Sequence, residues 1–255
     1  MTKFGMTWVV LFGAFALGNL IAGTCAWLLW PLVRQATKNL RAATAARVLF
    51  VWRALPTAGA IGLSVLATAA FLEFGPANAA ESPGLILLCQ AVIGLLLAIG
   101  SGVRLLGAAA STWRLRRTWR ESGRHIAVPR AALPVYVVES EFPVAAVVGF
   151  HRPDLVVSRA VAERCTTGEL AAIAAHENGH VQAGDNLRRL MLTVVCDSLS
   201  WTRRGTELVT AWQDAAEEAA DDHASASGAR ELDLASALVT VSRLVVPRVP
   251  SMWGT

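Results

Sequence analysis

The sequence predicts an α-helical membrane anchor of three transmembrane helices, followed by a small, mostly helical α+β domain. The first observation is composition: 54% of the 255 residues are hydrophobic and the mean hydropathy is +0.46, which is too high for an average soluble protein. The second is the presence of three long uncharged stretches in the first half of the chain. The third is a change of pattern after Leu133, where short Val-rich runs and then amphipathic helices follow.

The three uncharged stretches are long enough to cross a bilayer, which takes about 20 apolar residues. Residues 4–33 hold no charge in 30 positions, residues 54–72 none in 19, and residues 82–103 none in 22. A secretory signal is the alternative for the first stretch, but a signal core covers only about 7 to 15 residues. Tryptophans near the ends of this stretch suit the membrane interface: Trp8, Trp27 and Trp30.

Basic residues predict the orientation of these spans. Five basic residues and no acid separate the first span from the second, whereas two acids and no base separate the second from the third. Six arginines follow the third span within residues 104–124. The positive-inside rule then places the N-terminus outside and everything after the third span in the cytoplasm. We expect a multi-pass protein of a bacterial-type cell membrane, with the lipid bilayer as a partner.

The basic isoelectric point of 9.2 results from an excess of basic residues in the membrane anchor and the stretch that follows it. Residues 1–130 carry 13 basic and 3 acidic groups, whereas residues 131–255 carry 10 basic and 16 acidic groups. The run WRLRRTWR at 113–120 could bind nucleic acid, but beside a span it favours anionic lipid headgroups. No nucleic-acid partner is expected. The four cysteines form no CxxC pair, so neither a disulfide framework nor a thiolate zinc site is expected.

The pattern divides the chain into a three-span membrane domain (1–110), a basic juxtamembrane linker (111–130) and a cytoplasmic domain (131–255). Short Val-rich runs bounded by Pro, Gly and charged residues predict strands at 134–138, 143–150 and 154–158. Thr166 with Glu169 three residues later predicts a capping box, opening a helix to about Val181. Further helices are expected at 186–201, 206–227 and 232–246. The last, amphipathic and short for a span, is interpreted as a surface or membrane-lying helix; the alternative is a fourth membrane segment over 232–247.

The stretch AAIAAHENGHVQAGD carries the chemistry. His176 and His180 are four residues apart, so on a helix they share a face and can offer two imidazole nitrogens to one metal ion. Glu177 is close enough to reach a water on that ion, which is the logic of HExxH: the metal lowers the pKa of its water and the carboxylate takes the proton. The alternative is an ordinary helix with two hydrogen-bonded histidines, but paired polar residues are costly in an apolar helix without a function.

A catalytic zinc site also needs a third protein ligand, and the acidic run AWQDAAEEAADDHA offers one. Glu217 and Asp221 lie four apart, so Glu217 can complete a His, His, Glu set while Asp221 orients an imidazole. Glu218 makes the ligand ambiguous by one position, although only Glu217 keeps the spacing to Asp221. A solvated acidic helix face is the alternative for this run.

Together, TGELAAIAAHENGHVQAGD and the later EEAADD resemble the integral-membrane zinc metallopeptidases of the BlaR/MecR sensor type and their HtpX and Ste24 relatives, over roughly residues 133–226. The resemblance implies a zincin-like peptidase domain with the pairs HExxH and ExxxD, and a strand segment at 143–158 to whose edge an extended peptide may add. It also implies that Asp185 is the acid that follows the HExxH helix, with capping or a local hydrogen bond as its role. Such sensors continue into a penicillin-binding domain, whereas this chain stops at Thr255, so no antibiotic-sensing function is carried over.

These observations predict a membrane-anchored zinc endopeptidase that hydrolyses a protein or peptide substrate at the cytoplasmic membrane face. One Zn²⁺ per chain is expected on His176, His180 and Glu217, with Glu177 catalytic and Asp221 in support. Regulatory cleavage of a repressor is one option that the resemblance offers. The alternative is a non-catalytic membrane scaffold or receptor with a structural metal site. His125 and His151 are interpreted as surface residues, and His223 as an exposed histidine or an oxyanion-stabilising group.

Overall fold

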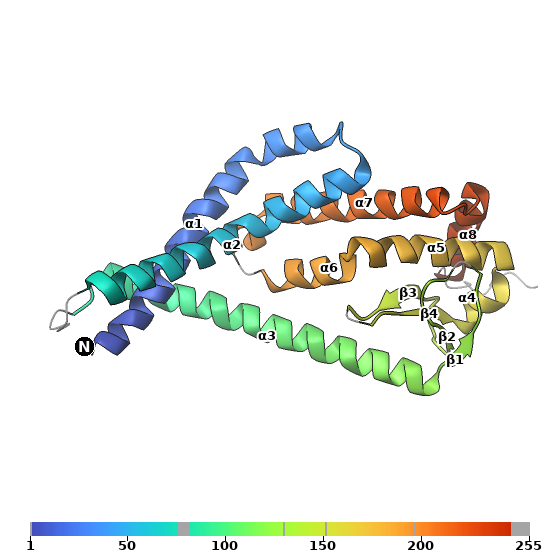
Figure 1. Cartoon of the computed structure of the whole chain (residues 1–255), viewed down its shortest axis with the longest axis horizontal. Helices are drawn as coiled ribbons and strands as arrows, with labels where there is room; N and C mark the ends of the chain where they lie inside the picture. Colours follow the sequence, from blue (N-terminus) through green and yellow to red (C-terminus); the bar gives the residue numbers. More distant parts are fainter. Residues whose placement is uncertain (1, 76–81, 130, 151, 196, 246–255) are drawn as a thin grey trace, which may run out of the picture. The chain divides into compact units, whose positions relative to one another are not determined.

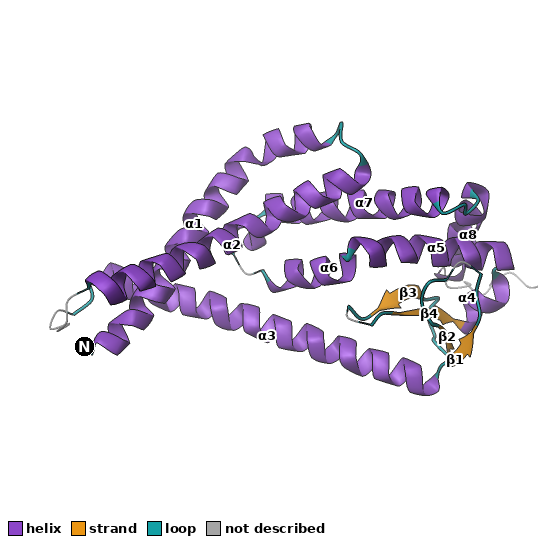
Figure 2. Cartoon of the chain, in the orientation of Figure 1, coloured by secondary structure: helices purple, strands orange, loops and turns teal. Residues whose placement is uncertain are grey.

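The chain is described by a computed structural model over residues 2–75, 82–129, 131–150, 152–195 and 197–245. Helices dominate the chain, and its strands form one small sheet (Figure 1 and Figure 2). Two compact units are present: unit 1 comprises Met1–Ala108 and Arg188–Ala215, and unit 2 comprises Ala109–Leu187 and Ala216–Thr255. The predicted fold class, three long apolar helices and then a mostly helical domain with a small sheet, is confirmed.

Three helices are long and apolar enough to cross a membrane: α1 (Lys3–Thr37), α2 (Ala42–Phe74) and α3 (Leu85–Ser122). Each runs past the uncharged stretch that predicted it, because a helix satisfies its own backbone and does not have to stop where charge begins. Residues 111–122, expected within a linker, are therefore the last turns of α3. The domain boundaries at 110 and 130 stay a prediction.

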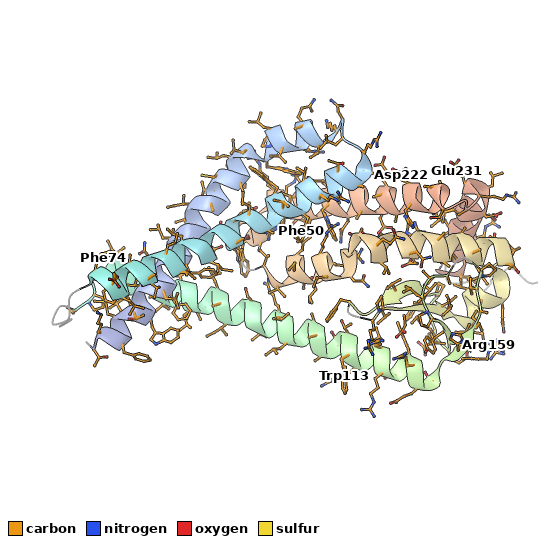
Figure 3. All side chains as sticks on the ribbon, in the orientation of Figure 1. Phe50, Phe74, Trp113, Arg159, Asp222 and Glu231 are labelled. Atoms are coloured by element: carbon orange, nitrogen blue, oxygen red, sulfur yellow. The ribbon has the colours of Figure 1, made fainter. Side chains whose placement is uncertain are left out.

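Small residues let the helices of unit 1 approach closely. A Cβ at Gly18 would lie 2.9 Å from the Cα of Ala60, and one at Gly94 would overlap the backbone carbonyl of Phe12. Helices in a bilayer associate through such close packing because lipid gives them no hydrophobic drive to associate. Large apolar side chains lie on the outside instead, as Phe74 does with 85% of its surface exposed (Figure 3). This pattern is the reverse of that of a soluble helical bundle and suits a bilayer.

A buried ion pair in unit 1 joins Arg53 of α2 to Asp197. Helix α6 (Asp185–Val194) is followed by the 3₁₀ helix η1 (Ser198–Trp201), whose N-cap is Asp197. The Asp197 carboxylate accepts a hydrogen bond from the Arg53 guanidinium at 2.6 Å, and the two side chains are only 0% and 3% exposed. The prediction of one continuous helix over 186–201 is therefore wrong, because Asp197 caps a new helix and pairs with a residue of α2.

The sheet of unit 2 has the strand order β1-β2-β4-β3, with β3 at one edge. Its strands are β1 (Arg124–Ile126), β2 (Val135–Val138), β3 (Ala145–Val148) and β4 (Asp154–Ser158). The central pair β2 and β4 is parallel, and both outer strands pair antiparallel. The three predicted strands are confirmed. β1 was not predicted, because three residues inside a basic run carry no alternation.

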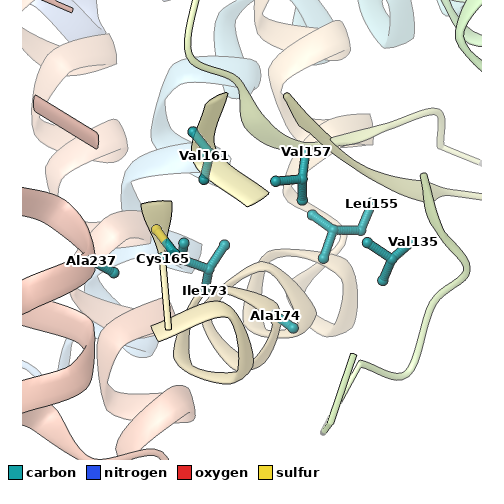
Figure 4. Close-up of a cluster of buried hydrophobic side chains, with 8 residues drawn as sticks. All are labelled: Val135, Leu155, Val157, Val161, Cys165, Ile173, Ala174 and Ala237. Carbon is teal, nitrogen blue, oxygen red and sulfur yellow. The ribbon is translucent and has the colours of Figure 1, made fainter. Parts of the chain in front are cut away.

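The helices of unit 2 cover one face of this sheet. Those that do so are α4 (Arg159–Arg164), α5 (Thr167–Ala183) and α8 (Glu231–Val245), whereas the last turns of α7 (Arg203–Ala226) pack against α5. Figure 4 shows the core between sheet and helices, in which side chains of β2 and β4 meet those of α4, α5 and α8. The cluster consists of Val135, Leu155, Val157, Val161, Cys165, Ile173, Ala174 and Ala237. The other face packs Val138, Val148 and Val156 against Trp119 of α3.

Two local predictions for these helices are confirmed. The capping box of Thr166 and Glu169 opens α5. Helix α8 is amphipathic as predicted: it packs one face into the core through Leu234 and Ala237 and exposes Leu232 and Leu238 on the other. Whether it lies in solvent or on the membrane stays a prediction. Only α1, α2 and α3 qualify as membrane spans among the described residues; the end of the suggested fourth segment, residues 246–247, lies outside them.

Candidate metal centre

Three side chains of unit 2 direct their ligand atoms to one point. The Nε2 atoms of His176 and His180, both on α5, lie 3.2 Å apart. Glu217 Oε2, on α7, lies 3.5 Å from each of them. Ligand atoms about 2.0 to 2.1 Å from a tetrahedral zinc ion would be separated by about 3.3 Å. The spacing of the three atoms therefore fits such an ion.

Carboxylates hold the far side of both imidazoles. Asp221 Oδ1 lies 2.8 Å from Nδ1 of His176, and Asp185 Oδ2 lies 2.9 Å from Nδ1 of His180. A carboxylate there keeps the proton on Nδ1 and leaves Nε2 as the ligand, the usual arrangement around metal-binding histidines. Asp185 reaches back because Gly184, with φ 73°, ends α5 in the left-handed conformation. The expected local hydrogen bond of Asp185 is thus one to His180.

The surrounding carboxylates also set the charge of the cluster. Burial acts against a charge on His180, but hydrogen bonds with Asp185 and Glu217 outweigh it and raise the pKa of His180 to about 9. Burial likewise opposes the charge on His176, yet its contacts with Glu217 and other acids raise its pKa. The same contacts hold the pKa of Glu217 well below its usual range. The cluster therefore favours positive charge at its centre, as a cation site should.

Close packing of α5 on α7 brings the third ligand within reach. A Cβ at Gly179 would lie 3.0 Å from the Cα of Ala220 and 3.1 Å from the Cβ of His223. Ala172 and Ala175 of α5 continue this small-residue contact with Ala224 of α7. Gly179 occupies a variable position of HExxH, so the motif gave no reason to select it. Its missing side chain lets Glu217 approach the two histidines.

Glu177 faces the edge of the sheet. Its Oε2 accepts a hydrogen bond from the backbone N–H of Val147 in β3 at 3.1 Å. Burial, the largest influence, raises the pKa of the Glu177 carboxyl. Asn186 binds the same strand, since its side-chain amide donates to the carbonyl oxygens of Val147 at 3.2 Å and Gly149 at 2.9 Å. Sequence reasoning did not select Asn186, because nothing in the local pattern links it to Val147 of β3, 39 residues earlier.

The remaining predicted residues are placed as follows. Glu217, not its neighbour Glu218, approaches both imidazoles. The Nε2 atom of His223 lies 3.3 Å from Ser227 Oγ, just beyond the end of α7, and His223 does not belong to the group of described side chains that could hold a metal ion. His125 is exposed and packs edge-on against Tyr136. His151 lies outside the described residues.

Comparison with known families assigns the second half of the chain. Residues 109–254, more than half of the chain, match the model of peptidase family M48. The chain belongs to this family. M48 peptidases are metal-dependent, and the His, His, Glu cluster lies within the matched region. The narrower resemblance to BlaR/MecR sensors, HtpX and Ste24 stays a prediction. No curated protein and no solved structure matches the chain.

Proposed function

We propose that this M48 family member is a membrane-anchored zinc endopeptidase that cleaves a protein substrate at the cytoplasmic membrane face. The observation that carries the proposal is the spacing of the three ligand atoms, 3.2 to 3.5 Å, with a carboxylate behind each imidazole. In this proposal residues 1–110 form the anchor, 111–130 the juxtamembrane linker and 131–255 the peptidase domain. The N-terminus would lie outside, as the basic residues between the spans predict.

His176, His180 and Glu217 would hold one Zn²⁺, with Asp221 and Asp185 orienting the imidazoles. Two imidazoles and one carboxylate are a common catalytic set for zinc, which when bound lowers the pKa of a coordinated water and polarises a carbonyl. The side chain of Glu217 is 53% exposed, so the cluster is open on one side. An open position supports a catalytic site over a closed structural one.

Glu177 would accept the proton of the attacking water and return it to the leaving amine. A general base works best with a pKa near the working pH, and burial moves the pKa of Glu177 upward in that direction. Its hydrogen bond to Val147 N–H keeps the carboxylate at the edge of β3. Since β3 is an edge strand, an extended substrate could add to it and present its peptide bond next to Glu177.

Membrane anchoring would limit the substrates to proteins that reach the bilayer surface. Regulatory cleavage of a cytosolic repressor and quality control of membrane proteins both satisfy this condition, and the resemblance to BlaR/MecR sensors favours the first. In the alternative, a scaffold or receptor, the same metal would be structural, and Glu177 would have no role in a reaction.

The test compares the metal content and the autoproteolysis of detergent-purified wild type, Glu177→Gln and His180→Ala. We expect about one zinc per chain in wild type and in Glu177→Gln, and loss of zinc in His180→Ala. Cleavage should fall by about 10² to 10⁴ in Glu177→Gln, the usual contribution of a general base. Cleavage that survives Glu177→Gln would contradict the mechanism, and a wild type that binds no zinc after reconstitution would favour the scaffold.

A further inference from the structure

A proline in α1 leaves one backbone carbonyl of unit 1 without its helical hydrogen bond. Pro31 has no N–H, so the carbonyl of Trp27, four residues earlier, lacks its helical partner. The guanidinium of Arg204 in α7 donates to this carbonyl at 2.8 Å and lies 4.0 Å from the centre of the Trp27 ring. These two contacts hold the Arg204 side chain against α1, and they involve no acid.

Arg204 lies in the wall of a hollow of about 410 Å³ within unit 1. The wall consists of Trp30, Pro31, Arg34, Gln35, Lys38, Arg204 and Glu207. Glu207, the one acid among them, forms an ion pair of 3.1 Å with Arg203, which is not part of the wall. Arg34 and Lys38 form no ion pair with any residue that the structure describes. The wall therefore carries three cations and one acid, a net charge of +2, and neither Arg34 nor Lys38 is paired with an acid that the structure describes.

Trp30, one of the wall residues, has a buried donor without a partner among the described residues. Trp30 is 3% exposed, and its indole Nε1 finds no hydrogen-bond acceptor among the described residues. A buried N–H left unpaired costs free energy comparable to a lost hydrogen bond. An acceptor supplied by a ligand would remove that cost. An anion with several acceptor oxygens matches both the cations of the wall and the unpaired donor.

We propose that this hollow, the α1–α7 pocket, binds the phosphate group of an anionic membrane lipid. Trp30, Arg34 and Lys38 lie at the end of the uncharged stretch 4–33. This is where we expect the first span to leave the hydrocarbon core of the bilayer. Basic pockets between helices at this level bind anionic headgroups. The site involves none of the residues of the metal centre, so it stands independently of the proposed peptidase activity.

Native mass spectrometry of the full chain tests the proposal. The detergent-solubilised protein is titrated with phosphatidylglycerol and, separately, with zwitterionic phosphatidylcholine. We expect one phosphatidylglycerol to bind in preference. Lys38→Gln and Arg34→Gln should each weaken it about fivefold, the value of one cation at a membrane surface. Trp30→Phe keeps the ring but removes the donor, and should weaken it about tenfold.

Arg47→Gln is the matched control, because it removes an exposed arginine of α2 that is not part of the pocket and should leave the affinity unchanged. Equal losses in Arg47→Gln and Lys38→Gln, or equal binding of the two lipids, would overturn the site. Displacement of the lipid by excess inorganic phosphate would show that the pocket binds free phosphate, and it would overturn the proposal of a lipid ligand. Thermal unfolding identifies any variant that misfolds, and the affinities of the correctly folded variants then test the pocket.

Discussion

Unit 1 and the metal centre of unit 2 use acidic and basic side chains in opposite ways. In unit 1, Asp197 accepts from Arg53, Thr57 and the backbone of Ser200, and Arg53 also donates to Ser200 Oγ. That network is sealed from solvent. In the metal centre, the side chains of Glu217 and Asp221 are 53% and 50% exposed although both contact histidines. Breaking the sealed pair would leave a charge buried without its partner, which is costly, whereas the partly exposed cluster remains accessible from solvent.

The largest effect should come from opening the sealed network. Asp197→Ala leaves the Arg53 charge buried without its partner and should lower the free energy of unfolding by about 3–5 kcal/mol. Glu163→Ala, which removes an exposed pair with Arg159, should cost at most about 0.5 kcal/mol. Denaturant unfolding in detergent measures both. Similar losses in the two variants would show that burial does not make the Arg53–Asp197 pair more important for the free energy of unfolding than an exposed pair.

The second prediction concerns the carboxylates behind the imidazoles. Asp221→Asn and Asp185→Asn remove the charge that keeps the proton on each Nδ1, and should each weaken metal binding about 10- to 100-fold. Competition with a chelator measures the affinity. Asp222→Asn is the control, since it changes an exposed neighbour on the same helix and should have no effect. If Asp222→Asn weakened binding as much, general charge and not orientation would be the cause.

The third prediction tests the close packing that assembles the open cluster. Gly179→Ala would press a methyl group on the backbone of Ala220 and should cost about 1–3 kcal/mol of stability, with weaker metal binding as Glu217 moves away. Gly62→Ala is the control, because no atom lies within 4 Å of its added Cβ. A Gly179→Ala protein with unchanged stability and metal affinity would mean that α7 can shift without moving its ligand.

Local patterns predicted more of unit 2 than of unit 1. The capping box and the three Val-rich strands depend on neighbours within a few residues, and these predictions are confirmed. The spacing within HExxH and ExxxD is equally local, and His176, His180 and Glu217 do lie together, whereas their role as zinc ligands stays a prediction. The end of α6 at Val194 was missed because Asp197, which caps the next helix, is held by Arg53, 144 residues away. β1 and α4 were missed because such short elements depend on partners that are distant in sequence.

The sequence alone determined the three apolar helices, the small sheet and the choice of His176, His180 and Glu217 as candidate metal ligands, because hydropathy and helical periodicity are local properties. The tertiary structure decided where those residues meet. The contact of Gly179 with Ala220 sets the distance from Glu217 to the histidines, and the turn at Gly184 brings Asp185 to His180. Such contacts join elements whose separation in the chain carries no periodic signal, so only the folded chain reveals them.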